Sequence, residues 1–164
     1  MAIADSLLPE FDREMSVTRK LLDRVPEDKI AWKPHPKSYS LGDLAIHVAN
    51  IPTWIRFIVN DDLFDTAAPF QRPAPFSTRS AALEFFDNNV LTARAALASA
   101  SDARLMGPWS LKHGEQTLFT MPRVAVLRSF AMNHHIHHRG QLTVYLRMHD
   151  VPLPNMYGPT ADER

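Results

Sequence analysis

Apolar residues recur at spacings of three and four over four long stretches of the chain, which is the period of an amphipathic helix. These stretches cover residues 5–25, 40–58, 79–101 and 122–149. Pro26 ends the first of them, because proline cannot continue a helix. The pattern therefore predicts four amphipathic helices of about 20 residues each.

Prolines and an alternating pattern occupy the segments between these helices. Residues 60–78 contain three prolines and predict a loop with no regular element. Residues 108–119 alternate between apolar and polar side chains around His113 and Gly114, which predicts a small β-hairpin. Pro52 lies inside the second helical stretch, where we expect it to kink the helix.

Helices of this number and length predict an all-α protein. One short and two longer connections join them, which is typical of a four-helix bundle, with the small hairpin before the last helix. We expect one such domain to span residues 1–164, because this length allows one sizeable core and would cramp two. An irregular all-α fold built from the same helices is the alternative.

Composition excludes several classes of protein. The 18 lysines and arginines balance 18 aspartates and glutamates, so the chain lacks the positive charge that drives nucleic-acid binding. No apolar run reaches the roughly 20 residues of a membrane span, and the N-terminus lacks the pattern of a secretory signal. We therefore expect a cytoplasmic protein without a membrane or nucleic-acid partner. The absence of cysteine excludes disulfides, thiolate metal sites and a cysteine nucleophile.

Histidine is the residue type that indicates a functional site. Four of the eight histidines lie in a five-residue window, 134–138, inside the last predicted helix. His134 and His138 are one turn apart on the same face of that helix. Leu127 and Ala131 extend this stripe, which we expect to be the buried one. Two imidazoles in this arrangement can bind a divalent first-row metal. The third ligand must come from another helix, and His47 is the only histidine on the inward face of one.

The type of ligand favours certain metals. Three neutral imidazoles favour Zn²⁺ or Ni²⁺, followed by Fe²⁺ and Mn²⁺, over Mg²⁺ and Ca²⁺, which prefer oxygen ligands. A lone histidine on an apolar face, such as His47, is more often a core residue than a metal ligand. Two buried imidazoles one turn apart would each need a partner, which a metal supplies. We interpret the neighbouring His135 and His137 as surface residues or as supports for the ligands.

Several polar and aromatic residues near these histidines are candidates for supporting roles. Asp43, one turn before His47, could orient that imidazole, although its position also fits a helix capping box. Arg139 and Gln141 could bind an anionic substrate or hold the helix by hydrogen bonds, and the structural role is favoured. Trp54 shares the face of His47 and could line a pocket, but an aromatic residue at helical spacing usually belongs to the core.

Four segments of the chain match, in order and spacing, the motifs of one known family. They are residues 133–141 (NHHIHHRGQ), 41–47 (LGDLAIH), 30–38 around a Trp-Lys-Pro sequence, and 151–159. The first resembles the last-helix motif of the DinB/YfiT-like superfamily of metal-dependent enzymes, and the second resembles the segment that carries its first ligand. The other two resemble its W-x-P connection and its C-terminal tail. The resemblance covers nearly the whole chain.

The resemblance implies a fold, a metal site and a class of reaction. It implies an up-down-down-up four-helix bundle, commonly a homodimer, with a metal held by His47, His134 and His138. Characterised branches act on small substrates with a low-molecular-weight thiol such as glutathione, mycothiol or bacillithiol, which the metal activates. Because this chain has no cysteine, such a thiol would be a cosubstrate. Tyr157, in the family-like tail, is expected to close over the metal as a lid.

Two other functions are open on the same three histidines. A metal site with a free position could activate water, which predicts a hydrolase acting on a small-molecule substrate. An ion with four protein ligands would only hold the helices together, as in a metal-binding, stress-related protein. A fourth ligand, from Asp43 or His137 for example, would favour that non-catalytic function.

Overall fold

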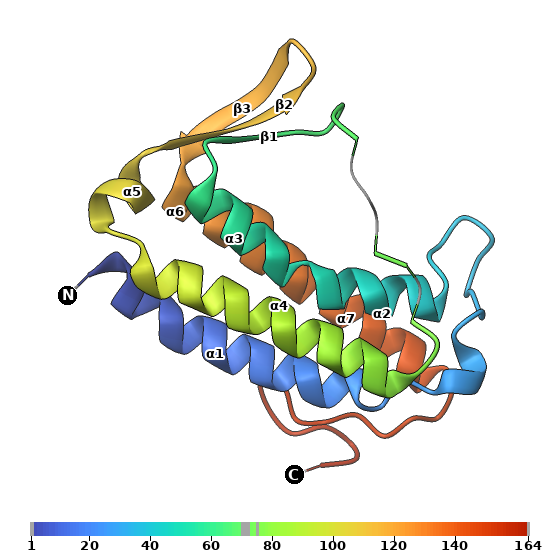
Figure 1. The fold of residues 1–164 in the computed structure, drawn as a ribbon. Helices are drawn as coiled ribbons and strands as arrows, with labels where there is room; N and C mark the ends of the chain where they lie inside the picture. The colour runs from blue at the N-terminus through green and yellow to red at the C-terminus, as the bar shows by residue number, and fades with distance from the viewer. Residues whose placement is uncertain (1, 70–72, 75, 164) are drawn as a thin grey trace.

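The protein is mostly helical, with a small three-stranded sheet at one end of the helices (Figure 1). This computed structural model describes residues 2–69, 73–74 and 76–163. The two longest helices, α1 (Ile3–Leu22) and α4 (Arg79–Ser99), pack against each other and correspond to the first and third predicted helices. None of the helices in these described ranges is long and apolar enough to cross a membrane.

The second predicted helix is divided into two. The first part, α2 (Leu41–Asn50), begins after Ser40, whose hydroxyl oxygen accepts a hydrogen bond from the Asp43 N–H at 3.0 Å. This contact confirms the capping box. The second part, α3 (Pro52–Asn60), follows at once. Pro52 has no N–H with which to continue α2 and lies in the first turn of α3, so the proline separates the two helices.

The last predicted helix consists of three consecutive segments. They are α6 (Arg123–Val126), a π-helical stretch η2 (Leu127–Met132) and α7 (Asn133–Arg147). A π turn contains more residues than an α turn, so the residues that follow it are rotated relative to an uninterrupted α-helix. The periodicity of the sequence did not predict this change of pitch.

The π-helical stretch changes which face of the helix is buried. Leu127 and Ala131 are buried, as predicted. His134 and His138, which were expected to extend that buried stripe, are only half-buried. The buried face of α7 is formed instead by His135, Arg139, Leu142 and Leu146. The prediction of one continuous buried stripe is therefore wrong beyond η2, because the wider turn shifts the phase of the helix.

The predicted hairpin is confirmed and belongs to a larger sheet. Strands β2 (Pro108–His113) and β3 (Gln116–Pro122) pair antiparallel across a turn in which Gly114 has a φ of +59°, a conformation that favours glycine. Strand β1 (Leu63–Asp65) adds parallel to β2. The prediction that residues 60–78 lack regular structure is therefore wrong, and the fold is not purely α-helical. A strand of three residues is too short to show an alternating pattern in the sequence.

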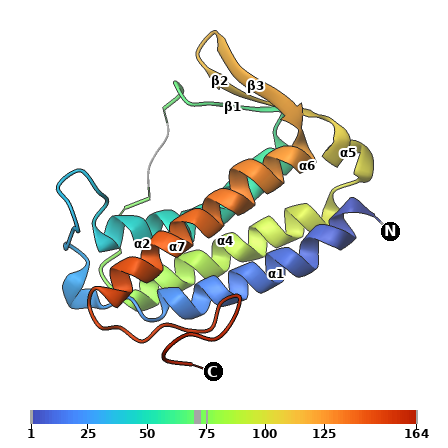
Figure 2. The same cartoon turned by 180° about the vertical axis from the view of Figure 1, so that it is seen from behind.

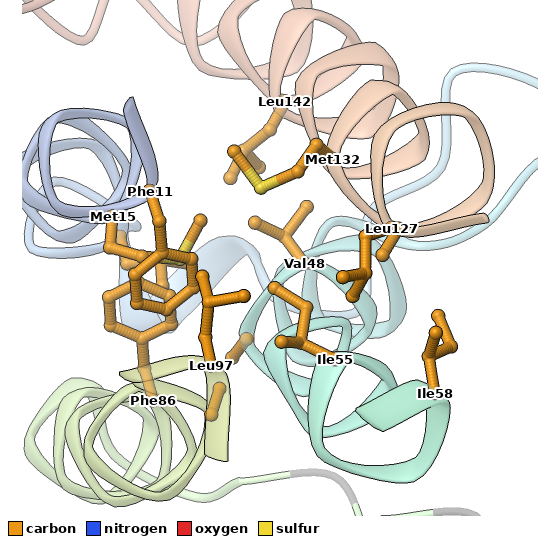
Figure 3. Packing of buried hydrophobic residues seen from close by; sticks show 14 of the residues in the cluster. Phe11, Met15, Val48, Ile55, Ile58, Phe86, Leu97, Leu127, Met132 and Leu142 are labelled. Atoms are coloured by element: carbon orange, nitrogen blue, oxygen red, sulfur yellow. The ribbon is translucent and has the colours of Figure 1, made fainter. Parts of the chain in front are cut away.

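One cluster of buried hydrophobic side chains lies between the helices (Figure 3). α1 and α4 line one side of it, and α2, α3 and the last helical segment line the other. The side chains labelled in Figure 3 are Phe11, Met15, Val48, Ile55, Ile58, Phe86, Leu97, Leu127, Met132 and Leu142. This core holds α2 and α7 in contact, which brings their facing side chains together. Two short elements, η1 (Glu27–Lys29) and α5 (Asp102–Met106), lie in the connections.

The C-terminal segment that follows α7 folds back along the helices and runs below α1 in both views (Figures 1 and 2). Two ion pairs attach it, one between Arg24 and Glu163 and one between Arg147 and Asp162. The segment is therefore held at the C-terminal ends of α1 and α7.

Candidate metal centre

Three histidines from two helices converge on one point. His47 comes from α2, and His134 and His138 come from α7. One ring nitrogen of each lies within 4.8 Å of the others, and the Nε2 atoms of His47 and His134 are 3.2 Å apart. All three side chains are half-buried, so part of each remains accessible to a ligand. The structure thus brings together the three histidines that the sequence singled out.

Local features of α2 and α7 position these rings. The Gly42 N–H donates to the Ile30 carbonyl oxygen at 2.8 Å, and a Cβ atom at Gly42 would lie 3.0 Å from that oxygen, so a larger residue would be tightly packed against Ile30. His134 and His138 are one turn apart on α7. Gln141 Oε1 lies 2.7 Å from Nδ1 of His138. Because an amide oxygen only accepts, this contact places the proton on Nδ1 and leaves Nε2 available to a metal.

Burial favours the neutral form of the two imidazoles on α7. It is the main reason that the pKa of His134 is lowered from 6.5 to about 4, with smaller contributions from His138 and His137. Burial also lowers the pKa of His138, although its hydrogen bond with Gln141 acts in the opposite direction. A neutral imidazole is the form that coordinates a metal, so these two rings are ready to bind at pH 7.

The distances suit a divalent transition metal. A tetrahedral ion that binds nitrogen at about 2.0–2.1 Å holds its ligand nitrogens about 3.3 Å apart. The 3.2 Å between the Nε2 atoms of His47 and His134 agrees with that value. Within the described ranges no carboxylate and no further histidine joins the group, and the chain has no cysteine. Three histidines without a fourth protein ligand are typical of catalytic zinc sites, which keep one position open.

A cavity of about 660 Å³ lies beside the cluster, bordered by α2, α3, η2 and the sheet. His47, Tyr39 and Trp54 are part of its wall. The Trp54 ring lies 5.9 Å from the ring of His47 and 4.9 Å from that of His134, measured between centroids. The Tyr39 ring lies 5.8 Å from His47 and 6.4 Å from His138. A ligand at the three histidines would therefore be flanked by aromatic rings.

The structure brings several other predicted site residues to the same region. Gln141 contacts His138 as described above, and the exposed His137 has its ring 4.9 Å from that of His138. Asp43 lines the cavity, while its Oδ2 accepts a hydrogen bond from Ser40 Oγ at 2.7 Å. This carboxylate therefore acts as part of the helix cap that begins α2.

Most residues of the cavity wall were not among the predicted site residues, and Asn50 and Tyr39 are two examples. Asn50 follows His47 by three residues, a spacing that places both on one face of α2, so the sequence carries a signal for it. Tyr39 directly precedes the N-cap of α2 and lies outside any helix. Periodicity therefore gives no information about where its ring points.

Arg139 and Tyr157 belong to a different group, between α7 and α1. The Arg139 guanidinium forms a buried ion pair with Glu14 at 2.6 Å and donates to the Tyr157 hydroxyl at 2.8 Å. The same hydroxyl donates to Glu14 at 2.8 Å. These contacts agree with the structural role favoured for Arg139. They place the Tyr157 hydroxyl on the ion pair rather than over the three histidines.

His135 belongs to this second group as well. Its side chain is 1% exposed, and its Nε2 atom lies 2.7 Å from Thr18 Oγ1 of α1. Burial is the main reason that the pKa of His135 is lowered to about 3. The expectation of a surface residue beside the ligands is therefore wrong, because the phase of α7 turns this ring toward α1.

Comparison with known proteins agrees with this fold. The chain is 28% identical over 160 residues to the uncharacterized protein YrdA of Bacillus subtilis (strain 168), a match that covers 97% of this chain and 90% of YrdA. A DinB-like protein from Bacillus cereus ATCC 10987 has a similar structure, with a TM-score of 0.74, 21% identity, and coverage of 95% of this chain and 98% of that one. The DinB-like protein YjoA from Bacillus subtilis gives a TM-score of 0.69 at 21% identity, with coverage of 97% and 99%.

These two structures show the fold alone, and the assignment to a family comes from the sequence. The family model described as DinB family matches residues 1–164. Since this match covers the whole chain, and the fold is shared with two DinB-like proteins, the chain belongs to the DinB family.

Proposed function

We propose that this protein is a metal-dependent enzyme in which His47, His134 and His138 hold a divalent transition metal. One observation carries the proposal: three imidazoles without a fourth protein ligand in the described part of the chain converge beside a cavity that can hold a small molecule. A purely structural site is closed by four protein ligands, so this arrangement supports catalysis. Imidazole ligands favour Zn²⁺ or Ni²⁺, followed by Fe²⁺ and Mn²⁺.

The reaction that we propose is the transfer of a low-molecular-weight thiol to a small electrophile. A divalent ion at this position would supply Lewis-acid chemistry that lowers the pKa of a thiol from its ordinary value of about 8.5. Because the chain has no cysteine, the thiol must be a cosubstrate. Gln141 holds the His138 ring in the orientation that binding requires, and the rings of Tyr39 and Trp54 flank His47.

We also propose a helix topology, a single domain and an oligomeric state for this protein. The four long helical segments form an up-down-down-up four-helix bundle, as one domain over residues 1–164. Contacts of α1 with α4 and α7, and of α2 with α4 and α7, support this arrangement. The family resemblance supports a cytoplasmic homodimer. Light scattering during gel filtration tests the dimer, which requires twice the 18.6 kDa mass of one chain.

The test of the reaction uses metal-loaded protein, a panel of thiols and the fluorogenic electrophile monochlorobimane. We expect turnover with at least one of glutathione, mycothiol and bacillithiol. Turnover should be lost in His47→Ala and kept in His35→Ala, a matched control that removes an exposed histidine outside the cluster. Failure of every thiol, together with metal-dependent hydrolysis of an ester such as p-nitrophenyl acetate, would replace the transferase by a hydrolase.

A further inference from the structure

The wall of the cavity beside the three histidines is mostly apolar and aromatic. Five of its residues are Trp54, Phe57, Phe64, Trp109 and Phe130. Aromatic side chains bury large apolar areas and favour stacked or edge-to-face contact with another ring. A cavity of about 660 Å³ with such a wall is within the size range of sites for small organic molecules.

The described part of this wall contains no lysine or arginine. Asp43 is the only charged side chain among the described residues that line the cavity, and it is acidic. An anionic group that entered would lose its hydration and find no lysine or arginine partner in the described wall. The described part of the wall is therefore unfavourable for anions.

Two side chains in the wall carry a polar group that makes no hydrogen bond to a residue that the structure describes: Asn50, and Trp109 through its buried Nε1. Asn50 is 8% exposed and lines the cavity. Its backbone carbonyl oxygen accepts from Thr53 Oγ1 at 2.8 Å, but its side-chain amide makes no hydrogen bond to any residue that the structure describes. Buried amides are normally paired, and an amide without a protein partner can instead pair with a bound molecule. Asn50 lies one turn along α2 from His47, on the same face.

We infer that this cavity binds an uncharged, largely aromatic molecule whose neutral polar group pairs with the amide of Asn50. An amide is the best match, because it can both donate to and accept from the asparagine side chain. The aromatic part then packs among the rings of the wall, with the polar group one helical turn from His47. The role of this molecule as the electrophilic substrate rests on the proposed function, whereas its binding does not.

The experiment compares two probes of nearly the same shape, 2-naphthamide and the 2-naphthoate anion. Binding is measured by isothermal titration calorimetry on protein treated with a chelator, so that no metal can hold the carboxylate. We expect 2-naphthamide to bind at least about tenfold more tightly than 2-naphthoate, because only the carboxylate is charged. Equal or tighter binding of 2-naphthoate, or no binding of either probe, would overturn the inference.

Variants of Asn50 test the residue itself. Asn50→Leu, which keeps a similar side-chain volume, should weaken 2-naphthamide binding about 5- to 30-fold, the range expected for one lost hydrogen bond to a polar ligand group. Asn60→Leu, at the exposed end of α3, is the matched control and should leave binding unchanged. If Asn50→Leu fails to fold, Asn50→Ala gives the same test. Unchanged binding in a folded Asn50 variant would contradict the assignment.

This measurement is independent of the proposed reaction. Thiol transfer needs the metal, whereas the probes bind to protein from which metal has been removed. An absence of transferase activity would therefore leave the binding result intact. A failure of 2-naphthamide to bind would equally leave the metal site and its reaction untouched.

Discussion

Two faces of α7 carry the same residue type in different environments. On one face, His134 and His138 meet His47 beside the cavity, and all three are half-buried. On the other face, His135 is buried against Thr18 of α1, and Arg139 next to it is paired with Glu14. The first face presents imidazole nitrogens beside the cavity, whereas the second pairs its side chains with Thr18 and Glu14 of α1. A histidine of α7 therefore belongs to the candidate site or to the contacts with α1 according to its partners, and not according to its residue type.

The two faces alternate in the sequence, so that each candidate ligand is followed directly by a structural residue. His134 precedes His135, and His138 precedes Arg139. Successive residues of an α-helix differ in direction by about 100°, so neighbours cannot share a face. Rigid attachment of one face to α1 therefore fixes the direction of the other. We expect substitutions on the α1 side to change stability and substitutions on the cavity side to change metal binding.

The largest effect is expected at the buried ion pair. Arg139→Met should lower the free energy of unfolding by about 3–5 kcal/mol, because it leaves the Glu14 carboxylate buried without its cationic partner. Urea denaturation followed by circular dichroism measures this change. The double variant Glu14→Gln with Arg139→Met should recover part of the loss, since it removes the unpaired charge. A loss below about 1 kcal/mol in the single variant would contradict a structural role for this face.

The buried ring of His135 should make stability depend on pH. Its pKa is about 3 in the folded protein, mainly because of burial, against an ordinary 6.5. As the pH falls below 6.5, the unfolded state binds a proton that the folded state does not, so the free energy of unfolding decreases. For this residue the loss between pH 7 and pH 5 should be about 2 kcal/mol.

Denaturation of chelator-treated protein at several pH values measures this slope. His134, with a pKa lowered to about 4, contributes in the same direction. His135→Gln should therefore reduce the slope without abolishing it. An identical slope in wild type and His135→Gln would show that the ring is not held neutral in the core.

A smaller effect is expected at the tail. Tyr157→Phe removes a hydroxyl that contacts both Glu14 and Arg139, so it should cost about 1 kcal/mol of unfolding free energy. Metal affinity should be unchanged, since that hydroxyl lies on the α1 side of α7. Thermal unfolding and a metal-competition titration of the same variant separate the two effects. A tenfold loss of metal affinity would instead place Tyr157 at the metal, as the family resemblance implied.

The smallest effect on stability is expected on the cavity side. Gln141 is exposed, and its side chain forms a hydrogen bond with the His138 ring, so Gln141→Ala should change the free energy of unfolding by less than about 0.5 kcal/mol. Its metal affinity should nevertheless fall about 10- to 100-fold, because the ring loses the partner that orients it. Competition with a chromogenic chelator measures this affinity. Unchanged affinity would exclude a supporting role for Gln141.

Much of the fold could be predicted from the sequence because long helices have a strong period. The four amphipathic stretches, the capping box at Ser40 and the division at Pro52 each depend on local chemistry that the sequence displays. The strand Leu63–Asp65 could not be predicted, because three residues carry no period and their pairing partner lies far along the chain. The π-helical stretch Leu127–Met132 has no signal in an apolar pattern read at a single helical period.

The candidate site was predictable to the extent that it depends on spacing within a helix. His134 and His138 are four residues apart and so share a face of one helix, and His47 lies on the inward face of another helix. The sequence pattern therefore predicted all three candidate ligands. His135 was misplaced because its environment depends on the pitch of the preceding turn and on Thr18, 117 residues away in the sequence. The cavity could not be predicted at all, since its wall combines helices, strands and a connection that meet only in the folded chain.

The central claim is that the cavity-side histidines, and not the buried ones, hold a divalent metal. The most direct measurement is the metal content of protein loaded with Zn²⁺ or Ni²⁺ and then desalted, for wild type, His134→Ala and His135→Gln, by inductively coupled plasma mass spectrometry. We predict about one ion per chain in wild type and in His135→Gln, and less than a tenth of that in His134→Ala. Stoichiometric metal in His134→Ala, or none in wild type, would contradict the account.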